Sequence, residues 1–349
     1  MADEILAFIQ GRVGRLRLNR PKALHALNEA MCRTMIELLL AWRSDPAVEL
    51  ILLDHAEGRG FCAGGDVRAI AESGGRGGDA ADAFFHTEYQ LNHLLFTYPK
   101  PVVSFLDGVV MGGGVGIGLP ARYRIATERT VFAMPEATIG LFPDVGGGWY
   151  LSRLPGRLGQ YLALTAARLN GADAKAFGLA THYVASDMLD EVRAKLVAQP
   201  EEVDAILKAS SAEPSDAPTV AARPSIDRLF AADTLEAIID ALAADPGDWA
   251  QQVLSGLRTK SPLSCKVALR LLERGATRTD FADEMREEYA IVTRICRGHD
   301  FVEGVRALLI DKDNAPRWDP ATPEEVTDAV VDAIFAPLAP ARAWQPLSR

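Results

Sequence analysis

The chain has 349 residues, of which 48% are hydrophobic and 24% charged, as in ordinary globular proteins that dissolve in water. Its formal net charge of −10 argues against nonspecific binding to nucleic acid. No signal-peptide pattern or run of 18 apolar residues is present, so we expect a cytoplasmic protein without a membrane partner. The four cysteines lack CxxC spacing, and no His, Cys and carboxylate cluster has ligand spacing, so we expect no disulfides and no metal.

Strands and helices alternate along the first half of the chain. Hydrophobic periodicity and turn residues predict the following elements in chain order: paired strands over 5–9 and 13–18 with Gly11 in the turn, a helix beginning at Asn28, a buried strand over 50–53, a helix from Val67 capped by Asp66, a helix over 80–96, a strand over 101–106, a helix over 114–119, and strands over 124–127 and 131–133. This repeat predicts an α/β protein, built either as a doubly wound sheet or as a spiral of ββα units.

The second half differs in composition. Residues 201–224 are rich in Pro, Ala, Ser and Glu without clear periodicity, which predicts a linker. We therefore divide the chain into a core over 1–200, a linker-like segment over 201–224 and a helical C-terminal region over 225–349. The expected helices there lie over 235–242, 264–272 and 301–309, the last with Asp300 as its N-cap. The tail, 336–349, has three prolines and is expected to be only partly ordered.

Two glycine-rich stretches carry the strongest functional signal. They are Phe-Cys-Ala-Gly-Gly-Asp over 61–66 and Met-Gly-Gly-Gly-Val-Gly over 111–116, and each follows a predicted strand. Glycine lets the backbone approach a ligand and present bare N–H groups. One N–H from each loop, aimed at the same carbonyl oxygen, would form an oxyanion hole. With Glu136 and Asp144 following as candidate acid/base groups, the sequence predicts an acyl-transfer or acyl-activating enzyme.

These motifs resemble a known family. Asn-Arg-Pro-Lys-Ala-Leu over 19–24, the two glycine-rich loops and Met-Pro-Glu over 134–136 together resemble the crotonase (enoyl-CoA hydratase/isomerase) superfamily. Longer stretches over 132–147 and 297–313 are similar to its 3-hydroxyisobutyryl-CoA hydrolase branch. The resemblance covers roughly residues 5–335.

The resemblance implies an α/β fold, a crotonase-like spiral of repeated ββα units with a helical C-terminal region. It also implies an acyl-coenzyme A substrate, no separate cofactor, and a homo-oligomer that is a trimer or a hexamer. Carried over by position, it assigns the oxyanion-hole N–H groups to Gly65 and Gly113, catalysis to Glu136 and Asp144, substrate contacts to Glu88, Gly113, Glu136 and Asp144, and coenzyme A contacts to Ala23, Ala63 and Gly65.

Two positions distinguish hydrolysis from hydration. Hydratases of the superfamily use a second glutamate at the position that Gly116 occupies here, while Asp144 stands where hydratases usually have glycine. We therefore expect a thioester hydrolase that releases 3-hydroxyisobutyrate and free coenzyme A from 3-hydroxyisobutyryl-CoA in valine breakdown. Glu136 would act either as a nucleophile or as a general base on water, and the sequence leaves both routes open.

Two other functions stay open at this stage. One is an enoyl-CoA hydratase or isomerase acting on a related acyl-CoA, and the other is a noncatalytic acyl-CoA-binding or scaffold protein. Individual residues also have purely structural interpretations: Glu88 and Glu136 as solvated carboxylates, Asp144 as a turn initiator, and Cys62 as a small buried hydrophobe instead of a nucleophile.

Overall fold

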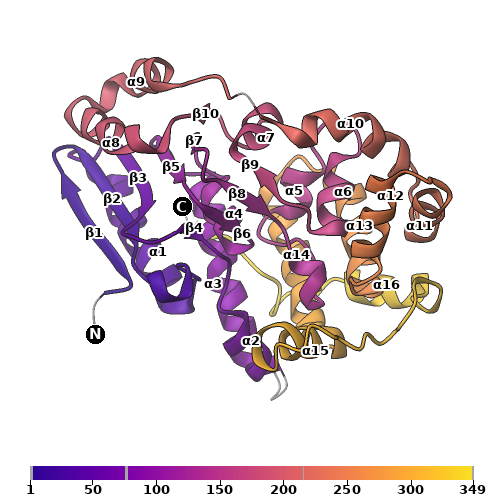
Figure 1. The fold of residues 1–349 in the computed structure, drawn as a ribbon. Coiled ribbons are helices and arrows are strands. Elements are labelled where there is room, and N and C mark those ends of the chain that lie inside the picture. The colour runs from indigo at the N-terminus through magenta and orange to yellow at the C-terminus, as the bar shows by residue number, and fades with distance from the viewer. Residues whose placement is uncertain (1–2, 75–77, 215, 348–349) are drawn as a thin grey trace.

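Two β-sheets occupy one end of the molecule, and most of the C-terminal helices gather at the other (Figure 1). The structure is a computed structural model that describes residues 3–74, 78–214 and 216–347. In these ranges no helix combines the length and apolar character needed to span a bilayer.

The larger sheet has six strands in the order β1-β2-β3-β5-β7-β10. Its first two strands pair antiparallel across the turn at Gly11, as predicted, and the remaining neighbours are parallel. The strands are β1 (Ile5–Gln10), β2 (Val13–Leu18), β3 (Leu50–His55), β5 (Val102–Leu106), β7 (Tyr123–Ala126) and β10 (His182–Tyr183).

The smaller sheet has four strands in the order β4-β6-β8-β9, and only its last pair is antiparallel. They are β4 (Gly60–Cys62), β6 (Val109–Met111), β8 (Val131–Ala133) and β9 (Leu169–Asn170). In the repeats that begin with β3, β5 and β7, the chain passes from a strand of the larger sheet to a strand of the smaller one and on into helical structure. The predicted spiral of ββα units is confirmed, and the doubly wound alternative is wrong.

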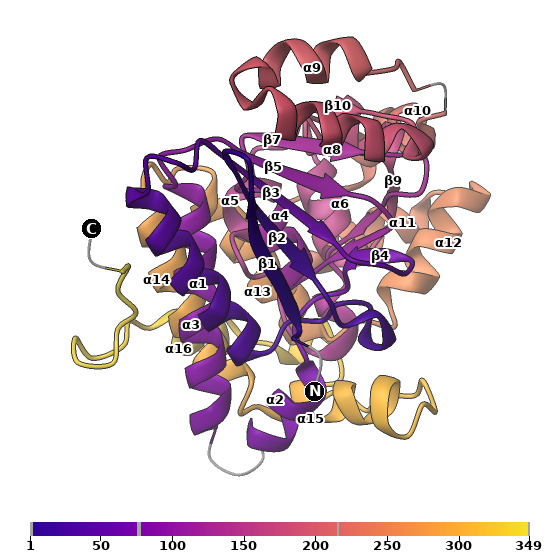
Figure 2. The ribbon, with the colours of Figure 1, turned by 90° about the vertical axis from the view of Figure 1, so that its left-hand side faces the viewer.

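Helices cover both faces of the larger sheet, as Figure 2 shows. On one side lie α1 (Glu29–Ser44) and α3 (Asp79–Phe96), and on the other α8 (Leu189–Ala198) and α9 (Val203–Ser210). Along β3, Leu50 and Leu52 pack in the cluster with α8 and α9, whereas Ile51 and Leu53 pack in the main core. A parallel strand buried on both faces needs an unbroken apolar run, which explains the sequence Leu-Ile-Leu-Leu.

The C-terminal helices share the main core with the spiral, because one cluster of buried apolar side chains extends from Ile5 to Trp344. The predicted helices over 235–242 and 264–272 are present, and the one predicted over 301–309 is a short α-helix followed by a π-helix, Arg306–Ile310. The remaining helices are α2 (Val67–Gly74), α4 (Gly113–Gly118), α5 (Gly147–Leu151), α6 (Leu158–Thr165), α7 (Gly171–Ala176), α10 (Pro218–Leu229), α11 (Leu235–Ala244), α12 (Asp248–Leu257), α13 (Pro262–Gly275), α14 (Phe281–Ile295), α15 (His299–Val305) and α16 (Asp328–Phe335).

The segment over 201–224 differs from the expected linker because it holds α9 and the first half of α10. In α9, Val203, Ile206 and Leu207 follow helical spacing and are buried. Pro218 begins α10, where its missing N–H removes no intrahelical hydrogen bond. Of the prolines in this segment, Pro218 therefore marks a helix start, and Pro224 lies inside α10.

One smaller expectation for the C-terminal region, the N-cap role of Asp300, is wrong. Asp300 lies inside α15, whose N-cap is Gly298, and its Oδ2 accepts a 2.6 Å hydrogen bond from the Ser261 hydroxyl. In the tail, Trp344 is completely buried and donates a 3.2 Å hydrogen bond to the His86 carbonyl on α3.

Candidate active site

One cavity of about 420 Å³ brings together the two glycine-rich loops and the acidic residues that follow them. Its wall includes residues of α3, α4 and the 3-10 helix Glu136–Ile139. Of the residues predicted to be functional, those that line it are Ala63, Gly65, Glu88, Gly113, Glu136 and Asp144. Ala23 is not one of its lining residues. Ala23 ends the 3-10 helix Pro21–Ala23, and the carbonyl of the next residue, Leu24, accepts a 3.0 Å hydrogen bond from the N–H of Ala63.

The two loops lie against each other because their strands, β4 and β6, are parallel neighbours. A Cβ atom added to Gly113 would lie 3.3 Å from the nitrogen of Gly65 and would collide with Oε1 of Glu88. At the next position, a Cβ atom added to Gly114 would lie 2.3 Å from the Cys62 carbonyl oxygen, so only glycine fits there. The second glycine-rich stretch is therefore required by the packing of the cavity wall.

The N–H groups of Gly65 and Gly113 are both available at this wall. Leu27 forms a parallel bridge with the first loop. Its N–H donates to the Gly64 carbonyl, and its own carbonyl accepts from the N–H of Asp66. In such a parallel bridge the N–H of the intervening residue, Gly65, points away from Leu27. Gly113 is the first residue of α4, where N–H groups have no intrahelical acceptor.

Three carboxylates are buried around these amides. Glu88 is 2% exposed, Glu136 5% and Asp144 4%. Among the described residues, Oε1 of Glu88 and Oε2 of Glu136 have no hydrogen-bond partner. Buried polar atoms are nearly always paired in folded proteins, so these free oxygens indicate a place where a ligand or water completes the structure.

Burial shifts the acid–base behaviour of all three groups. It raises the pKa of Glu88, with further contributions from the nearby charges of Asp144 and Glu136. Burial also raises the pKa of Glu136, and the charge of Asp144 adds to the effect. For Asp144, burial raises the pKa to about 7, opposed by a 2.8 Å hydrogen bond from the Tyr89 hydroxyl. Strongly shifted carboxyl groups converging on one cavity are typical of a catalytic site.

The position of Gly116 leaves no room for a larger side chain. A Cβ atom there would lie 2.6 Å from Cβ of Val145 and 2.8 Å from Nδ2 of Asn92. Val145 itself has φ +53°, which is rare for a β-branched residue. The volume that a glutamate at position 116 would need is therefore filled by the residue that follows Asp144.

Several residues at the cavity were not predicted from the sequence. Arg168, Lys260 and Leu308 line it, and the Tyr89 hydroxyl donates a hydrogen bond to the Asp144 carboxylate. The adjacency of Tyr89 to Glu88 was the only local cue, because the others lie far apart in the chain without a shared motif. Cys62, by contrast, is completely buried beside the cavity, and burial raises the pKa of its thiol to about 12, which supports its structural interpretation.

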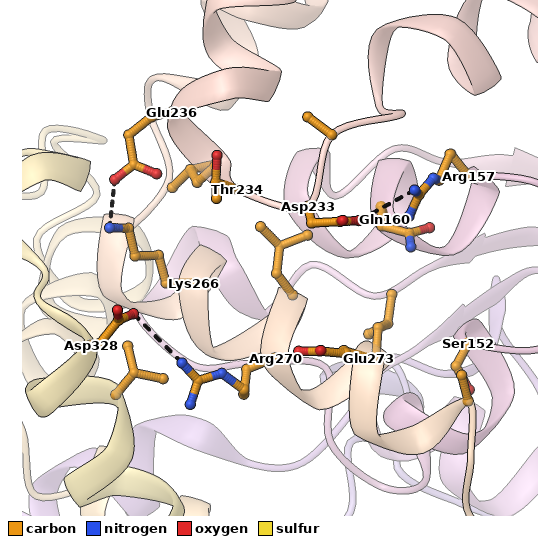
Figure 3. Close-up of a pocket in the computed structure, with 16 residues that line it drawn as sticks. Ser152, Arg157, Gln160, Asp233, Thr234, Glu236, Lys266, Arg270, Glu273 and Asp328 are labelled. Atoms are coloured by element: carbon orange, nitrogen blue, oxygen red, sulfur yellow. Dashed lines mark hydrogen bonds and ion pairs between the residues drawn. The ribbon is translucent and has the colours of Figure 1, made fainter.

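A second cavity, of about 560 Å³, lies among α6, α11, α13 and α16 and is shown in Figure 3. Its cations already have carboxylate partners: Lys266 with Glu236 at 2.5 Å, Arg157 with Asp233 at 3.3 Å and Arg270 with Asp328 at 3.6 Å. Because these charges neutralise one another, we assign the functional site to the first cavity, where the buried carboxylates face one another.

Comparison with known proteins matches this geometry. A model of the enoyl-CoA hydratase/isomerase family matches residues 13–335. The chain is 43% identical to the mitochondrial 3-hydroxyisobutyryl-CoA hydrolase of Xenopus tropicalis, covering 96% of this chain and 89% of that protein. It is 41% identical to the human enzyme of the same name, covering 97% and 89%, and 42% identical to 3-hydroxyisobutyryl-CoA hydrolase 1 of Arabidopsis thaliana, covering 95% and 91%.

Two solved structures are similar over nearly the whole chain. A structure titled carnitinyl-CoA dehydratase, from Mycobacterium thermoresistibile, has a TM-score of 0.93 at 44% identity and covers 97% of this chain and 98% of its own. One titled enoyl-CoA hydratase, from Rhodobacter sphaeroides, has a TM-score of 0.91 at 37% identity and covers 98% and 100%. The chain belongs to the enoyl-CoA hydratase/isomerase (crotonase) family, in the branch of the 3-hydroxyisobutyryl-CoA hydrolases.

Proposed function

We propose that the chain is a thioester hydrolase that releases 3-hydroxyisobutyrate and free coenzyme A from 3-hydroxyisobutyryl-CoA, a step of valine breakdown. The observation that carries this proposal is that both glycine-rich loops, through Gly65 and Gly113, line one cavity together with three buried carboxylates. The names of the curated relatives support the same choice of substrate. Coenzyme A is part of the substrate, and no separate cofactor enters the proposal.

The thioester carbonyl oxygen would accept hydrogen bonds from the N–H groups of Gly65 and Gly113. Negative charge that develops on this oxygen during attack is then stabilised by donors already in place. Removing one donor of this kind typically lowers the rate by about 10²–10³. The donors belong to the backbone, so they cost no side-chain ordering when the substrate binds.

Glu136 would act at the carbonyl carbon by one of two routes. As a general base it takes a proton from water while the water oxygen bonds to that carbon. As a nucleophile its carboxylate bonds to the carbon first, and water then cleaves the resulting anhydride. In both routes the carbon–sulfur bond breaks and coenzyme A leaves as a thiolate that takes up a proton. Its raised pKa makes ionised Glu136 a stronger base than a solvated glutamate.

Asp144 would accept a hydrogen bond from the 3-hydroxyl of the acyl group. The Tyr89 hydroxyl bonds to Oδ2 and orients the carboxylate. A site built around a hydroxyl discriminates strongly against the analogue that lacks it, since its buried polar atoms are then left unpaired. This arrangement would select 3-hydroxyacyl thioesters over plain acyl thioesters.

The remaining wall would hold the rest of the substrate. Glu88 lies beside Gly113 and would contact the acyl group, and Ala63 and Gly65 would lie beside the pantetheine. Ala23, linked to the first loop through Leu24, would lie near the adenine. Arg168 and Lys260 supply positive charge at the same cavity, suited to the phosphates of coenzyme A.

Hydration or dehydration of an acyl-CoA is the second candidate. The titles of the two similar solved structures favour it, as does the presence of two glutamates, Glu88 and Glu136, in one cavity. Against it stands the filled space at Gly116. A dehydratase would produce an enoyl thioester and release no thiol.

A thiol-release assay distinguishes the two candidates. Purified protein is given 3-hydroxyisobutyryl-CoA and, as a matched control, isobutyryl-CoA, which differs only by the hydroxyl. We expect rapid release of free thiol from the first and at least tenfold slower release from the second. Appearance of enoyl absorbance without free thiol would favour the dehydratase, and no turnover of any acyl-CoA would favour a binding protein.

The cytoplasmic location expected from the sequence, and the trimeric or hexameric assembly implied by the resemblance, belong to the same proposal. Cell fractionation tests the first, and light scattering of the purified protein tests the second. A membrane-bound fraction or a monomer in solution would contradict them.

A further inference from the structure

A glutamate from the C-terminal helical region bonds directly to the turn that carries Asp144. Glu288, on α14, is completely buried. Its Oε2 accepts a 2.8 Å hydrogen bond from the N–H of Gly146, and its Oε1 accepts one of 3.3 Å from the N–H of Gly148. The two oxygens of one side chain thus hold two of the four residues that follow Asp144.

This turn needs external support. Val145 has φ +53°, and a β-branched residue held in this sparsely populated region is strained. The N–H groups of Gly146 and Gly148 lie at the start of α5, where a helix leaves its first donors without intrahelical acceptors. Glu288 supplies both acceptors and so offsets the strain at Val145.

Asp144 is therefore held from two directions. The Tyr89 hydroxyl fixes its carboxylate, and Glu288 fixes the backbone that follows it. The two supports are connected, since the ring of Tyr89 lies edge-on to that of Tyr289, the neighbour of Glu288, at 6.3 Å between centroids. Glu288 itself does not line the cavity in the described part of the chain.

We propose that Glu288 is a positioning residue for Asp144: its carboxylate holds the turn over 145–148 so that the Asp144 side chain faces the substrate. The inference rests on the proposed role of Asp144 in recognising the 3-hydroxyl. It adds a residue of the helical region, 144 positions further along the chain, to the machinery of substrate selection.

The decisive variant is Glu288→Gln, which keeps the shape of the side chain but leaves only one acceptor oxygen for two N–H donors. Glu287→Gln is the matched control, because Glu287 lies on the same helix and pairs instead with Arg274 and Arg278. A misplacement of about 1 Å costs on the order of 10² in rate. We therefore expect Glu288→Gln to lower kcat for 3-hydroxyisobutyryl-CoA about tenfold to hundredfold, with KM within about twofold, and the preference over isobutyryl-CoA to fall. Glu287→Gln should change neither value more than about twofold.

A double-mutant cycle tests whether Glu288 acts through Asp144. Contacts that act as a unit give non-additive effects. In the Asp144→Asn background, Glu288→Gln should lower the rate by less than about twofold further. The inference would be overturned if the rate losses of the two single variants multiplied in the double variant. An unchanged kcat for Glu288→Gln alone would also overturn it. Glu288→Asp, which withdraws the carboxylate by one methylene, should give the same pattern if the Gln variant fails to fold.

Amide hydrogen exchange separates this inference from the proposed function. The N–H groups of Gly146 and Gly148 should be protected in the wild-type protein and should exchange at least tenfold faster in Glu288→Gln, but not in Glu287→Gln. Wild-type protein that releases no thiol would refute the hydrolase proposal, while this exchange measurement would still decide the role of Glu288. Unchanged protection of both amides in Glu288→Gln would refute that role.

Discussion

The carboxyl groups of the cavity reduce the stability of the fold at neutral pH. Glu88, Glu136 and Asp144 are buried beside one another, and each has a raised pKa. A carboxyl whose pKa is higher in the folded state binds more protons there than in the unfolded state. Its contribution to stability therefore declines as the pH rises from the unfolded pKa toward the folded one. Catalysis needs such groups, and the rest of the core offsets their cost.

Asp144→Asn tests this linkage directly. The pKa of Asp144 is raised from 3.8 to about 7, so the wild-type protein loses stability across this interval as the pH rises. Asparagine does not titrate and still accepts the Tyr89 hydrogen bond. Urea denaturation should show that the variant gains stability relative to wild type between pH 5 and pH 8, on the order of 1–3 kcal/mol. A difference between variant and wild type that stays constant with pH would contradict the shifted pKa.

Glu136→Gln tests the reacting group. Loss of a general base or nucleophile lowers rates by at least about 10²–10⁴, so thiol release should fall by that factor. The shape of the side chain is kept, so the dissociation constant for coenzyme A, measured by calorimetry, should change less than about threefold. Glu128→Gln, at an exposed carboxylate that accepts a hydrogen bond from the Ser186 N–H, should leave the rate unchanged. Activity retained by Glu136→Gln would rule out both proposed routes.

At the scale of elements, α4 sets how the cavity wall packs. Its glycines let the helix start directly behind the first loop, and at Gly116 the neighbouring Val145 and Asn92 fill the space of a side chain. The Gly116 position of this helix packs directly against Val145, in the turn after Asp144. The glycine at 116 and the placement of Asp144 are therefore parts of one packing arrangement.

Gly116→Ala should destabilise the protein by overpacking. Its Cβ would approach Val145 to 2.6 Å, and forcing extra methyl groups into a packed core costs about 1–3 kcal/mol. Gly256→Ala on α12 is the control, because nothing lies within 4 Å of its added Cβ, and there alanine should raise stability by about 0.5–1 kcal/mol. Thermal unfolding of both variants gives the comparison, and a neutral Gly116→Ala would contradict the filled space.

Local patterns predicted the spiral well and the long-range contacts poorly. The paired strands β1 and β2 and the buried run of β3 follow from alternation and apolar content, and the glycine-rich loops with Glu136 and Asp144 follow from motif and resemblance. Glu288 and Tyr89 were missed as partners of the turn at Asp144, since hydrogen bonds between distant segments leave no local periodicity. Helix α9 was missed because the compositional bias of its surroundings obscured three apolar residues at helical spacing.

At the scale of the whole molecule, the helical region completes the site as well as the core. Lys260 and Leu308 of this region line the cavity. Glu288 accepts a hydrogen bond from the turn after Asp144, and Trp344 bonds to α3. One apolar cluster joins these helices to the spiral. Residues 1–200 alone would therefore leave both the core and the cavity incomplete.

Trp344→Ala should show how much the tail contributes. The indole is completely buried, its Nε1 donates to the His86 carbonyl, and its ring lies 5.7 Å from that of His93. Removing a buried tryptophan costs about 3–5 kcal/mol. Urea denaturation should show this loss, and Trp318→Ala, at a half-buried indole that bonds to Thr259, should cost markedly less. Equal effects of the two substitutions would contradict a special role for the tail.

The position of Trp344 has a consequence for how the protein is made. The indole reaches α3, the helix that bears Glu88, from 258 positions beyond its hydrogen-bond partner His86. During synthesis, this helix emerges from the ribosome long before the tryptophan that covers it. The nascent chain therefore leaves the surface of α3 beneath the indole uncovered until the segment that holds Trp344 has been translated.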